Sequence, residues 1–134
     1  MTEGALLQTI DAFWAARLKG DTAAVLSFAS SDAEYEMVGA SGFGDPKTYG
    51  PAAVAPAAAR LIDDFKFHSL ERLTAIISGD QAVTVNRVQV SFRGGPPVTS
   101  EVCDVWAFDD AGKMRSLRQF VDTDLVRRMI DGNV

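Results

Sequence analysis

The spacing of apolar residues changes once along the chain, near Phe65, and this change constrains the fold more than any other feature. Before Phe65 most apolar residues recur three or four positions apart, as in helices that bury one stripe; after it they alternate, as in strands with one buried face. Helices followed by strands predict an α+β fold with the helices on one face of an antiparallel sheet. The length of 134 residues fits one domain, so residues 1–134 are expected to form a single unit.

The same patterns predict the individual elements. The expected helices cover residues 3–19, 21–29, 51–64 and about 122–130. The expected strands cover residues 33–38, 67–78, 82–92, 98–108 and 113–121, the last four forming a meander. Ser30–Asp32 is interpreted as a break and Gly39–Gly50 as a glycine-rich loop that shapes any pocket.

Composition excludes several classes of protein. A single cysteine, Cys103, excludes an intrachain disulfide framework, and one histidine, His68, with one cysteine argues against a structural zinc site. A net charge of −5 argues against nucleic acid or an anionic membrane as partner. Because no signal peptide or membrane-spanning stretch is recognisable, we expect a cytoplasmic protein. We also expect a protein that uses no metal and no cofactor.

One strand places a carboxylate where an apolar residue is expected. In the strand before the last, alternation puts Asp104 on the same face as Trp106 and Phe108, which is the more apolar face. A carboxylate there is costly unless it is hydrogen-bonded, paired or protonated, and burial without a cation raises its pKa. Two interpretations stay open: a structural ion pair with Arg118 or Arg87, or a ligand-facing catalytic acid/base.

Other residues are candidates for a ligand pocket around this carboxylate. Gln119 lies on the pocket face if the last two long strands pair as a hairpin; the alternative is a partly solvated edge residue. Tyr35 and Met37 share one face of the first strand, and both also suit a plain core. The pocket that we expect is walled by Phe13, Trp14, Tyr35, Met37, Tyr49, Trp106 and Gln119.

Three stretches together resemble a known superfamily. They are Phe13–Ala33, with a Gly-Asp pair between its two helices, Tyr49–Val54, and Asp104–Met114. In this order they resemble the nuclear-transport-factor-2-like superfamily, which includes ketosteroid isomerases, SnoaL-like polyketide cyclases and limonene-epoxide hydrolases. The resemblance covers about residues 4–130. It implies a cone-shaped, curved antiparallel sheet wrapped around the N-terminal helices, a cystatin-like α+β roll, and a homodimer formed through the convex sheet face.

The resemblance transfers only one of three ketosteroid isomerase roles. The aspartate that donates a hydrogen bond to the oxyanion falls on Asp104, whereas the oxyanion tyrosine falls on Phe13 and the base falls on Met37. The standard ketosteroid isomerase mechanism is therefore not expected. The Asp-Arg-Asp set of the epoxide hydrolases is missing too, because Val102 stands two positions before Asp104 and Gln119 or Val121 stands on the inward face of the next strand.

Two functions of different classes follow from this resemblance. The first is a SnoaL-like protein with a hydrophobic pocket for a small apolar molecule, acting as a cofactor-independent isomerase, cyclase or hydratase with Asp104 as acid/base or hydrogen-bond donor. The alternative is a non-catalytic ligand-binding module or a dimeric scaffold. The missing tyrosine and base favour the alternative, and the sequence does not identify a ligand.

Overall fold

The computed structural model describes residues 2–39 and 47–134 of the chain. The helices are α1 (Glu3–Lys19), α2 (Thr22–Ser27), α3 (Gly50–Asp64) and α4 (Thr123–Ile130). The strands are β1 (Ala29–Val38), β2 (Lys47–Tyr49), β3 (Phe65–Ser78), β4 (Gln81–Phe92), β5 (Val98–Phe108) and β6 (Met114–Phe120). Most of the predicted glycine-rich loop, residues 40–46, lies outside the described residues.

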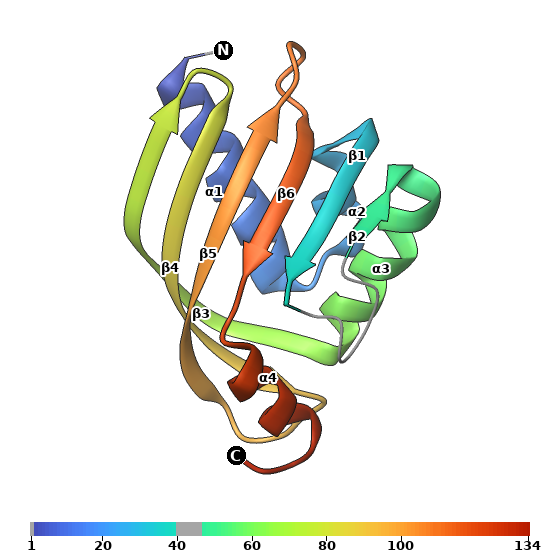
Figure 1. Ribbon diagram of the computed structural model, residues 1–134, viewed down its shortest axis with the longest axis vertical. Helices are drawn as coiled ribbons and strands as arrows, with labels where there is room; N and C mark the ends of the chain where they lie inside the picture. The colour runs from blue at the N-terminus through green and yellow to red at the C-terminus, as the bar shows by residue number, and fades with distance from the viewer. Residues whose placement is uncertain (1, 40–46) are drawn as a thin grey trace.

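One curved sheet carries the fold (Figure 1). Its strand order is β2-β1-β6-β5-β4-β3, and every neighbouring pair is antiparallel except β1 and β6, which run parallel. The helix α1 crosses behind the sheet, α3 lies at the β1 side, and α4 lies at the end where β3, β4 and β5 converge. The α+β class, the meander β3–β6 and the N-terminal helices on one face confirm the prediction, although the sheet is mixed rather than purely antiparallel.

The curvature has a local cause in β3. Its pairing with β4 slips twice, between Phe67 and Ser69 and between Arg72 and Thr74. Each slip adds an unpaired residue to one strand, which bends that strand and increases its twist. The sheet therefore wraps around α1, and its inner face becomes concave.

The predicted break at Ser30–Asp32 is wrong. The strand β1 begins at Ala29 and includes these residues, with an irregular register between Ala29 and Glu34. The Ser30 hydroxyl donates to Asp32 Oδ1 at 2.8 Å, so these turn-forming side chains satisfy each other while the backbone stays extended. The short edge strand β2 was not predicted either, because it has only three residues.

The predicted caps of α1, α2 and α4 are confirmed, but α2 ends at Ser27 rather than at Ala29, which begins β1. Gly20 ends α1 with φ of 70°, a left-handed conformation that glycine adopts without strain. The Asp21 carboxylate accepts from the Ala24 N–H at 3.1 Å, and the Asp122 carboxylate accepts from the Leu125 N–H at 3.0 Å. Asp122 thus caps α4, as its position just before the helix indicated.

The core consists of two clusters of buried apolar residues. The larger lies between α1 and the sheet and includes Leu6, Ile10 and Trp106; the smaller lies against α4 and includes Val88, Val102 and Met129. The concave sheet face supplies residues to both. The space between them is where a ligand site is expected in a fold of this shape.

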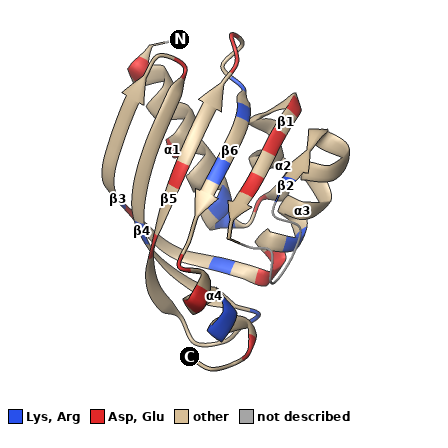
Figure 2. Ribbon diagram, viewed as in Figure 1, with Lys and Arg blue, Asp and Glu red and all other residues tan. Residues whose placement is uncertain are grey.

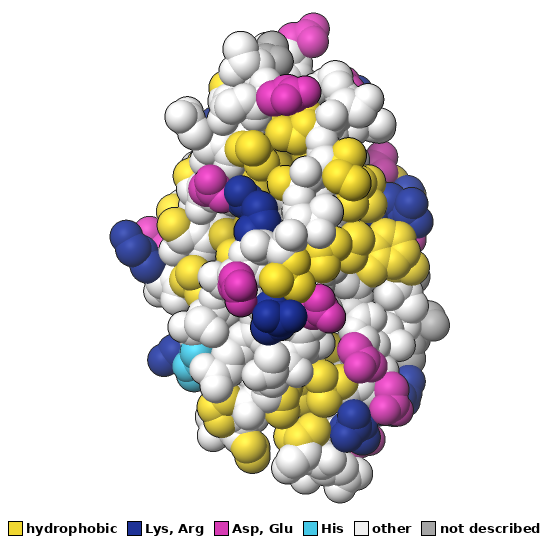
Figure 3. All heavy atoms as spheres, turned by 90° about the vertical axis from the view of Figure 1, so that its left-hand side faces the viewer, with side chains coloured by type: hydrophobic (Ala, Val, Ile, Leu, Met, Phe, Trp, Pro, Cys, Tyr) yellow, Lys and Arg dark blue, Asp and Glu magenta, His cyan; other side chains and the backbone are white. Residues whose placement is uncertain are grey.

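Charged residues lie mainly on the outer surface (Figure 2). Arg118 pairs with Glu36 across β6 and β1 at 3.0 Å, and Arg87 pairs with Glu71 across β4 and β3 at 3.4 Å. Figure 3, which turns the β3 edge toward the viewer, shows acidic and basic side chains interspersed among apolar ones. Within residues 2–39 and 47–134, the longest helices are too short or too polar to cross a bilayer.

Candidate functional site

Asp104 lies in the buried face of β5. Alternation along the strand directs Val102, Asp104 and Trp106 to the concave side, and their exposed fractions are 4%, 0% and 1%. The prediction that this face looks toward the core is confirmed. The carboxylate is thus removed from water by the same alternation that buries its apolar neighbours.

This carboxylate has no cation beside it among the described residues. The two arginines considered as structural partners, Arg118 and Arg87, pair with glutamates on the outer surface. Neither Asp104 oxygen has a partner in hydrogen-bond geometry. Burial therefore raises the pKa of Asp104 to about 7, and the Gln119 amide opposes only part of this rise.

Gln119 connects Asp104 to Tyr35. It is the register partner of Asp104 on β6, and its Oε1 accepts a hydrogen bond from the Tyr35 hydroxyl at 2.8 Å. Burial, and to a lesser extent the nearby Asp104, raise the pKa of Tyr35, so its hydroxyl stays protonated and continues to donate. The result is a row of three polar side chains across β5, β6 and β1, with the Gln119 amide in the middle.

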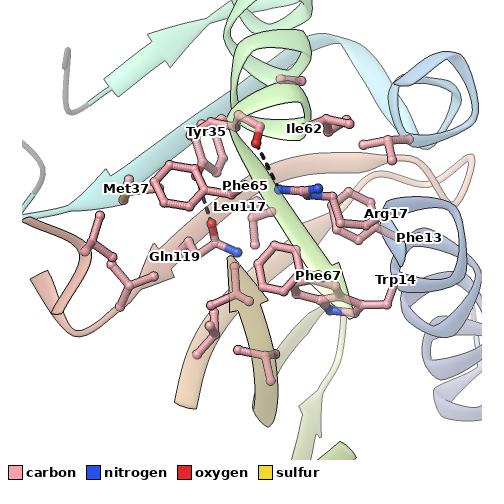
Figure 4. Close-up of a pocket in the computed structure, with 18 of the residues that line it drawn as sticks. Phe13, Trp14, Arg17, Tyr35, Met37, Ile62, Phe65, Phe67, Leu117 and Gln119 are labelled. Carbon is pink, nitrogen blue, oxygen red and sulfur yellow. Dashed lines mark hydrogen bonds between the residues drawn. The ribbon is translucent and has the colours of Figure 1, made fainter. Parts of the chain in front are cut away.

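A cavity of about 120 Å³ lies between the two core clusters (Figure 4). Helices α1, α2, α3 and α4 and strands β1 and β3–β6 contribute to its wall. Four lining residues carry polar side-chain groups apart from the Trp14 indole: Arg17, Tyr35, Ser100 and Gln119. The others are apolar, so the cavity has the composition of a small-molecule site with a few fixed polar groups.

The structure brings five of the seven predicted pocket residues to this cavity. They are Phe13, Trp14, Tyr35, Met37 and Gln119. Phe13 and Met37, which stand where ketosteroid isomerases have their tyrosine and base, therefore face the cavity with apolar side chains only. No proton donor or acceptor is present at either position.

The other three predicted site residues do not line the cavity. Trp106 is packed behind the wall, where its ring centroid lies 5.1 Å from that of Phe13, and Tyr49 on the edge strand β2 is 58% exposed. Asp104 itself is fully buried and does not line the cavity, but it is next to two lining residues: Val102, two positions before it on β5, and Gln119, its register partner on β6.

Sequence reasoning missed two buried polar residues beside Asp104. Thr84 and Asn86 on β4 are both 0% exposed; Thr84 is opposite Asp104, and its hydroxyl accepts from the Trp106 indole at 3.0 Å. Both side-chain polar atoms of Asn86 lack a partner among the described residues. The alternation of β4 contained the signal, since residues 84 and 86 share a face with Val88 and Val90.

Arg17 was also missed as a site residue. It follows Phe13 by four positions and Trp14 by three, which places it on the same face of α1. Its side chain lines the cavity, and the residue is only 9% exposed. The spacing contained this information, because it places Arg17 on the stripe of α1 that faces the core.

The histidine and cysteine do not enter the site. His68 Nε2 lies 2.8 Å from the Ser91 hydroxyl, and neither residue lines the cavity. Cys103 points away from Asp104, since neighbouring residues of a strand face opposite sides. Within the described part of the chain, no three histidine, cysteine or acidic side chains gather closely enough to hold a metal ion.

The family comparison matches most of the chain. The model of the SnoaL-like domain matches residues 10–117, which begin within α1, include β1 and β3–β5, and end at Leu117 within β6. None of the curated proteins matches the sequence.

Solved structures share the fold at low sequence identity. A proposed isomerase from Bacillus subtilis superposes with a TM-score of 0.88 at 18% identity, covering 100% of this chain and 98% of its own. An epoxide hydrolase from M. tuberculosis, described as LEH-like, gives 0.74 at 22% identity with coverages of 96% and 92%. A proposed polyketide cyclase from Xanthomonas campestris gives 0.74 at 17% identity with coverages of 95% and 97%. At these identities the likeness shows the fold alone.

Proposed function

The chain belongs to the SnoaL-like domain family, and from that premise we propose that it binds a small, largely apolar molecule in the cavity and transfers a proton on it. The reaction class is that of an isomerase, cyclase or hydratase that needs no cofactor. One observation carries the proposal: a fully buried carboxyl group with a pKa of about 7 lies beside residues that line an apolar cavity. A carboxyl group with this pKa both gives and takes a proton readily near neutral pH.

The neighbouring side chains support this role for Asp104. Gln119 lies beside it at the cavity wall, and Tyr35 fixes the amide by donating to Gln119 Oε1. In the proposed reaction a carbonyl-bearing ligand enters between Val102 and Gln119. The ionised Asp104 removes a proton from the carbon next to the carbonyl, which leaves an enolate, and the protonated Asp104 then returns the proton to the same carbon or, where a C=C bond adjoins that carbon, to the far carbon of the double bond, so no proton is gained or lost.

Proton exchange on a simple ketone tests this proposal. We expect the protein to accelerate deuterium exchange at the carbons flanking the carbonyl of cyclohexanone, and Asp104→Asn to reduce the rate at least tenfold because an amide is not a base at this pH. Proton NMR in deuterated buffer measures the exchange. The matched control is Asp110→Asn, which removes the same charge from an exposed residue.

The protonation of Asp104 gives a second, independent readout. Carbon NMR of the labelled carboxyl groups, assigned with Asp104→Asn, should show one of them titrating near pH 7. Exchange that is equally fast in wild type and Asp104→Asn would contradict the catalytic role, as would an Asp104 pKa near 4.

A second function, non-catalytic binding in the same cavity, is favoured by a specific observation. Asp104 does not line the cavity, whereas Tyr35 and Gln119 do. In this case cyclohexanone binds, Asp104→Asn changes its affinity less than tenfold, and no exchange is catalysed. A dimeric scaffold is the third alternative, and it requires that the cavity bind nothing. The observation in its favour is the cavity volume of about 120 Å³, which is smaller than the ~300 Å³ of typical drug-sized sites.

We also propose that two copies associate through the outer face of the sheet. Helices do not cover this face in the described part of the chain (Figure 1), and it carries a mixture of polar and apolar side chains. Phe120, 37% exposed, is the register partner of Cys103, and Arg118 is that of Val105. Such a mixture suits a semi-polar interface. Gel filtration should give a dimer that Phe120→Asp shifts toward the monomer, and a wild-type monomer would contradict the proposal.

A further inference from the structure

Arg17 is a buried cation in the wall of an apolar cavity. Its side chain leaves the last turn of α1, and the residue is only 9% exposed. Figure 4 shows the guanidinium extending into the space between Ile62 and Phe67, with Tyr35 and Gln119 on the other side. The charge therefore faces the cavity rather than bulk water.

The protein gives this cation little compensation. One terminal nitrogen, Nη2, donates to the Leu61 carbonyl at 3.1 Å, and the guanidinium lies 4.5 Å from the centre of the Phe67 ring. Seven ion pairs join other residues, and none in the described part of the chain includes Arg17. Since a guanidinium has five N–H donors, most of its hydrogen-bonding capacity stays unused.

The neighbouring polar groups do not supply the missing negative charge. Tyr35 interacts electrostatically with Arg17, but its raised pKa keeps it a neutral phenol. Burial lowers the pKa of Arg17 to about 10, which leaves the guanidinium charged at neutral pH. A buried charge is costly unless it is paired, and a guanidinium does not escape the cost by losing its proton.

We propose that the cavity binds an anion, and that Arg17 pairs with a carboxylate, or a similar acidic oxygen, of a small and otherwise apolar ligand. The free edge of the guanidinium suits a carboxylate, which accepts two parallel hydrogen bonds. The apolar wall would hold the remainder of the molecule. The volume of about 120 Å³ is of the same order as that of a 150 Å³ cavity known to hold benzene, so the ligand should be a small acid with at most one ring.

This inference rests on the proposed function only in requiring that the cavity bind a ligand. It adds the chemical class of that ligand and a recognition residue, and it is independent of whether Asp104 is catalytic. Calorimetric titration with benzoate and benzamide tests it, because the two molecules have nearly the same shape and differ in charge. We expect wild type to bind benzoate at least tenfold more tightly than benzamide.

Variants of Arg17 assign that preference to the guanidinium. Arg17→Met keeps an unbranched apolar stem against Phe67 but removes the charge, so the preference for benzoate should disappear while benzamide affinity changes less than threefold. Arg60→Met, which removes an exposed arginine from α3, should retain the preference. Arg17→Lys keeps the charge without the planar fork and should lower the preference at least threefold, which gives a second measurement if Arg17→Met does not fold.

The outcomes separate this inference from the proposed function. Equal affinity for benzoate and benzamide in wild type would overturn the inference while leaving binding in the cavity intact. A preference for benzoate that survives in both Arg17→Met and Arg17→Lys would overturn the assignment to Arg17. If neither molecule binds at millimolar concentration, the inference fails, whereas the proposed function fails only if cyclohexanone does not bind either.

Discussion

Arg17 and Asp104 are both buried and both lack an oppositely charged partner in the described part of the chain, yet their situations differ. Arg17 lines the cavity from α1, whereas Asp104 on β5 is fully buried beside the lining residues and does not line the cavity itself. Burial raises the pKa of Asp104 to about 7 and lowers that of Arg17 to about 10. At neutral pH the carboxyl group is therefore partly protonated, while the guanidinium is fully charged.

The difference shows how each group meets the cost of burial. A carboxylate relieves the cost by taking up a proton, so Asp104 is stable without a partner at low pH and becomes costly as the pH rises. An arginine has no such route and requires an anion at any physiological pH. The two residues thus indicate different roles: proton transfer for Asp104 and recognition of charge for Arg17.

The largest effect should be the pH dependence of stability that comes from Asp104. The pKa of Asp104 is higher in the folded state than the ordinary 3.8, so the folded protein holds this proton more tightly than the unfolded chain does. Protonated Asp104 therefore adds to the free energy of unfolding at low pH, and this contribution is lost as the pH rises toward 7. Between pH 5 and pH 8 this amounts to about 3 kcal/mol, at 1.36 kcal/mol per pKa unit. Asp104→Asn should therefore gain about that much relative to wild type over this interval, measured by urea unfolding.

An exposed carboxylate provides the control for this measurement. Asp110→Asn removes the same charge at the turn before β6, so it corrects for the change in overall charge. If wild type and Asp104→Asn lose stability in parallel between pH 5 and pH 8, the Asp104 carboxyl group is either exposed or paired. The comparison with Arg17 is then wrong.

An intermediate effect is expected for a buried polar group that does have a partner in the protein. The Trp106 indole donates to the Thr84 hydroxyl at 3.0 Å, beside Asp104. Thr84→Val keeps the shape but leaves the indole N–H without an acceptor, which should cost about 1–3 kcal/mol. Thermal unfolding measures the loss. In a Trp106→Phe background the same substitution should be close to neutral, and an equal cost in both backgrounds would contradict the role of this hydrogen bond.

The smallest effect should come from removing the charge of Arg17. Arg17→Met loses the hydrogen bond to the Leu61 carbonyl and the contact of the guanidinium with Phe67, but it also removes the cost of a buried charge. These contributions have opposite signs, so the free energy of unfolding should change by less than about 1 kcal/mol. A loss of more than 3 kcal/mol in urea unfolding would identify Arg17 as a structural clamp between α1 and α3.

The predicted helices and strands were correct where the local sequence pattern and the tertiary structure favour the same backbone conformation. The long strands β3, β4 and β5 alternate and end at turn residues, so their bounds were predicted to within about two residues, within the accuracy expected of such patterns. The predicted break at Ser30–Asp32 was wrong because these residues favour turns locally, while the flanking residues Ala29 and Glu34 pair with β6 and hold the segment between them in the strand. The parallel pairing of β1 with β6 joins distant segments, and local sequence patterns do not specify such a pair.

The sequence by itself determined the order of the long elements and placed Asp104 on the apolar face of its strand, because periodicities of 3.6 and 2 fix which side chains share a face. Only the tertiary structure decided what those side chains meet. Curvature of the sheet set the depth of the cavity and left Asp104 out of its lining, and the packing of α1 against α3 and β3 left Arg17 without a carboxylate among the described residues. Distances between elements depend on the combined packing of all layers, which no local pattern contains.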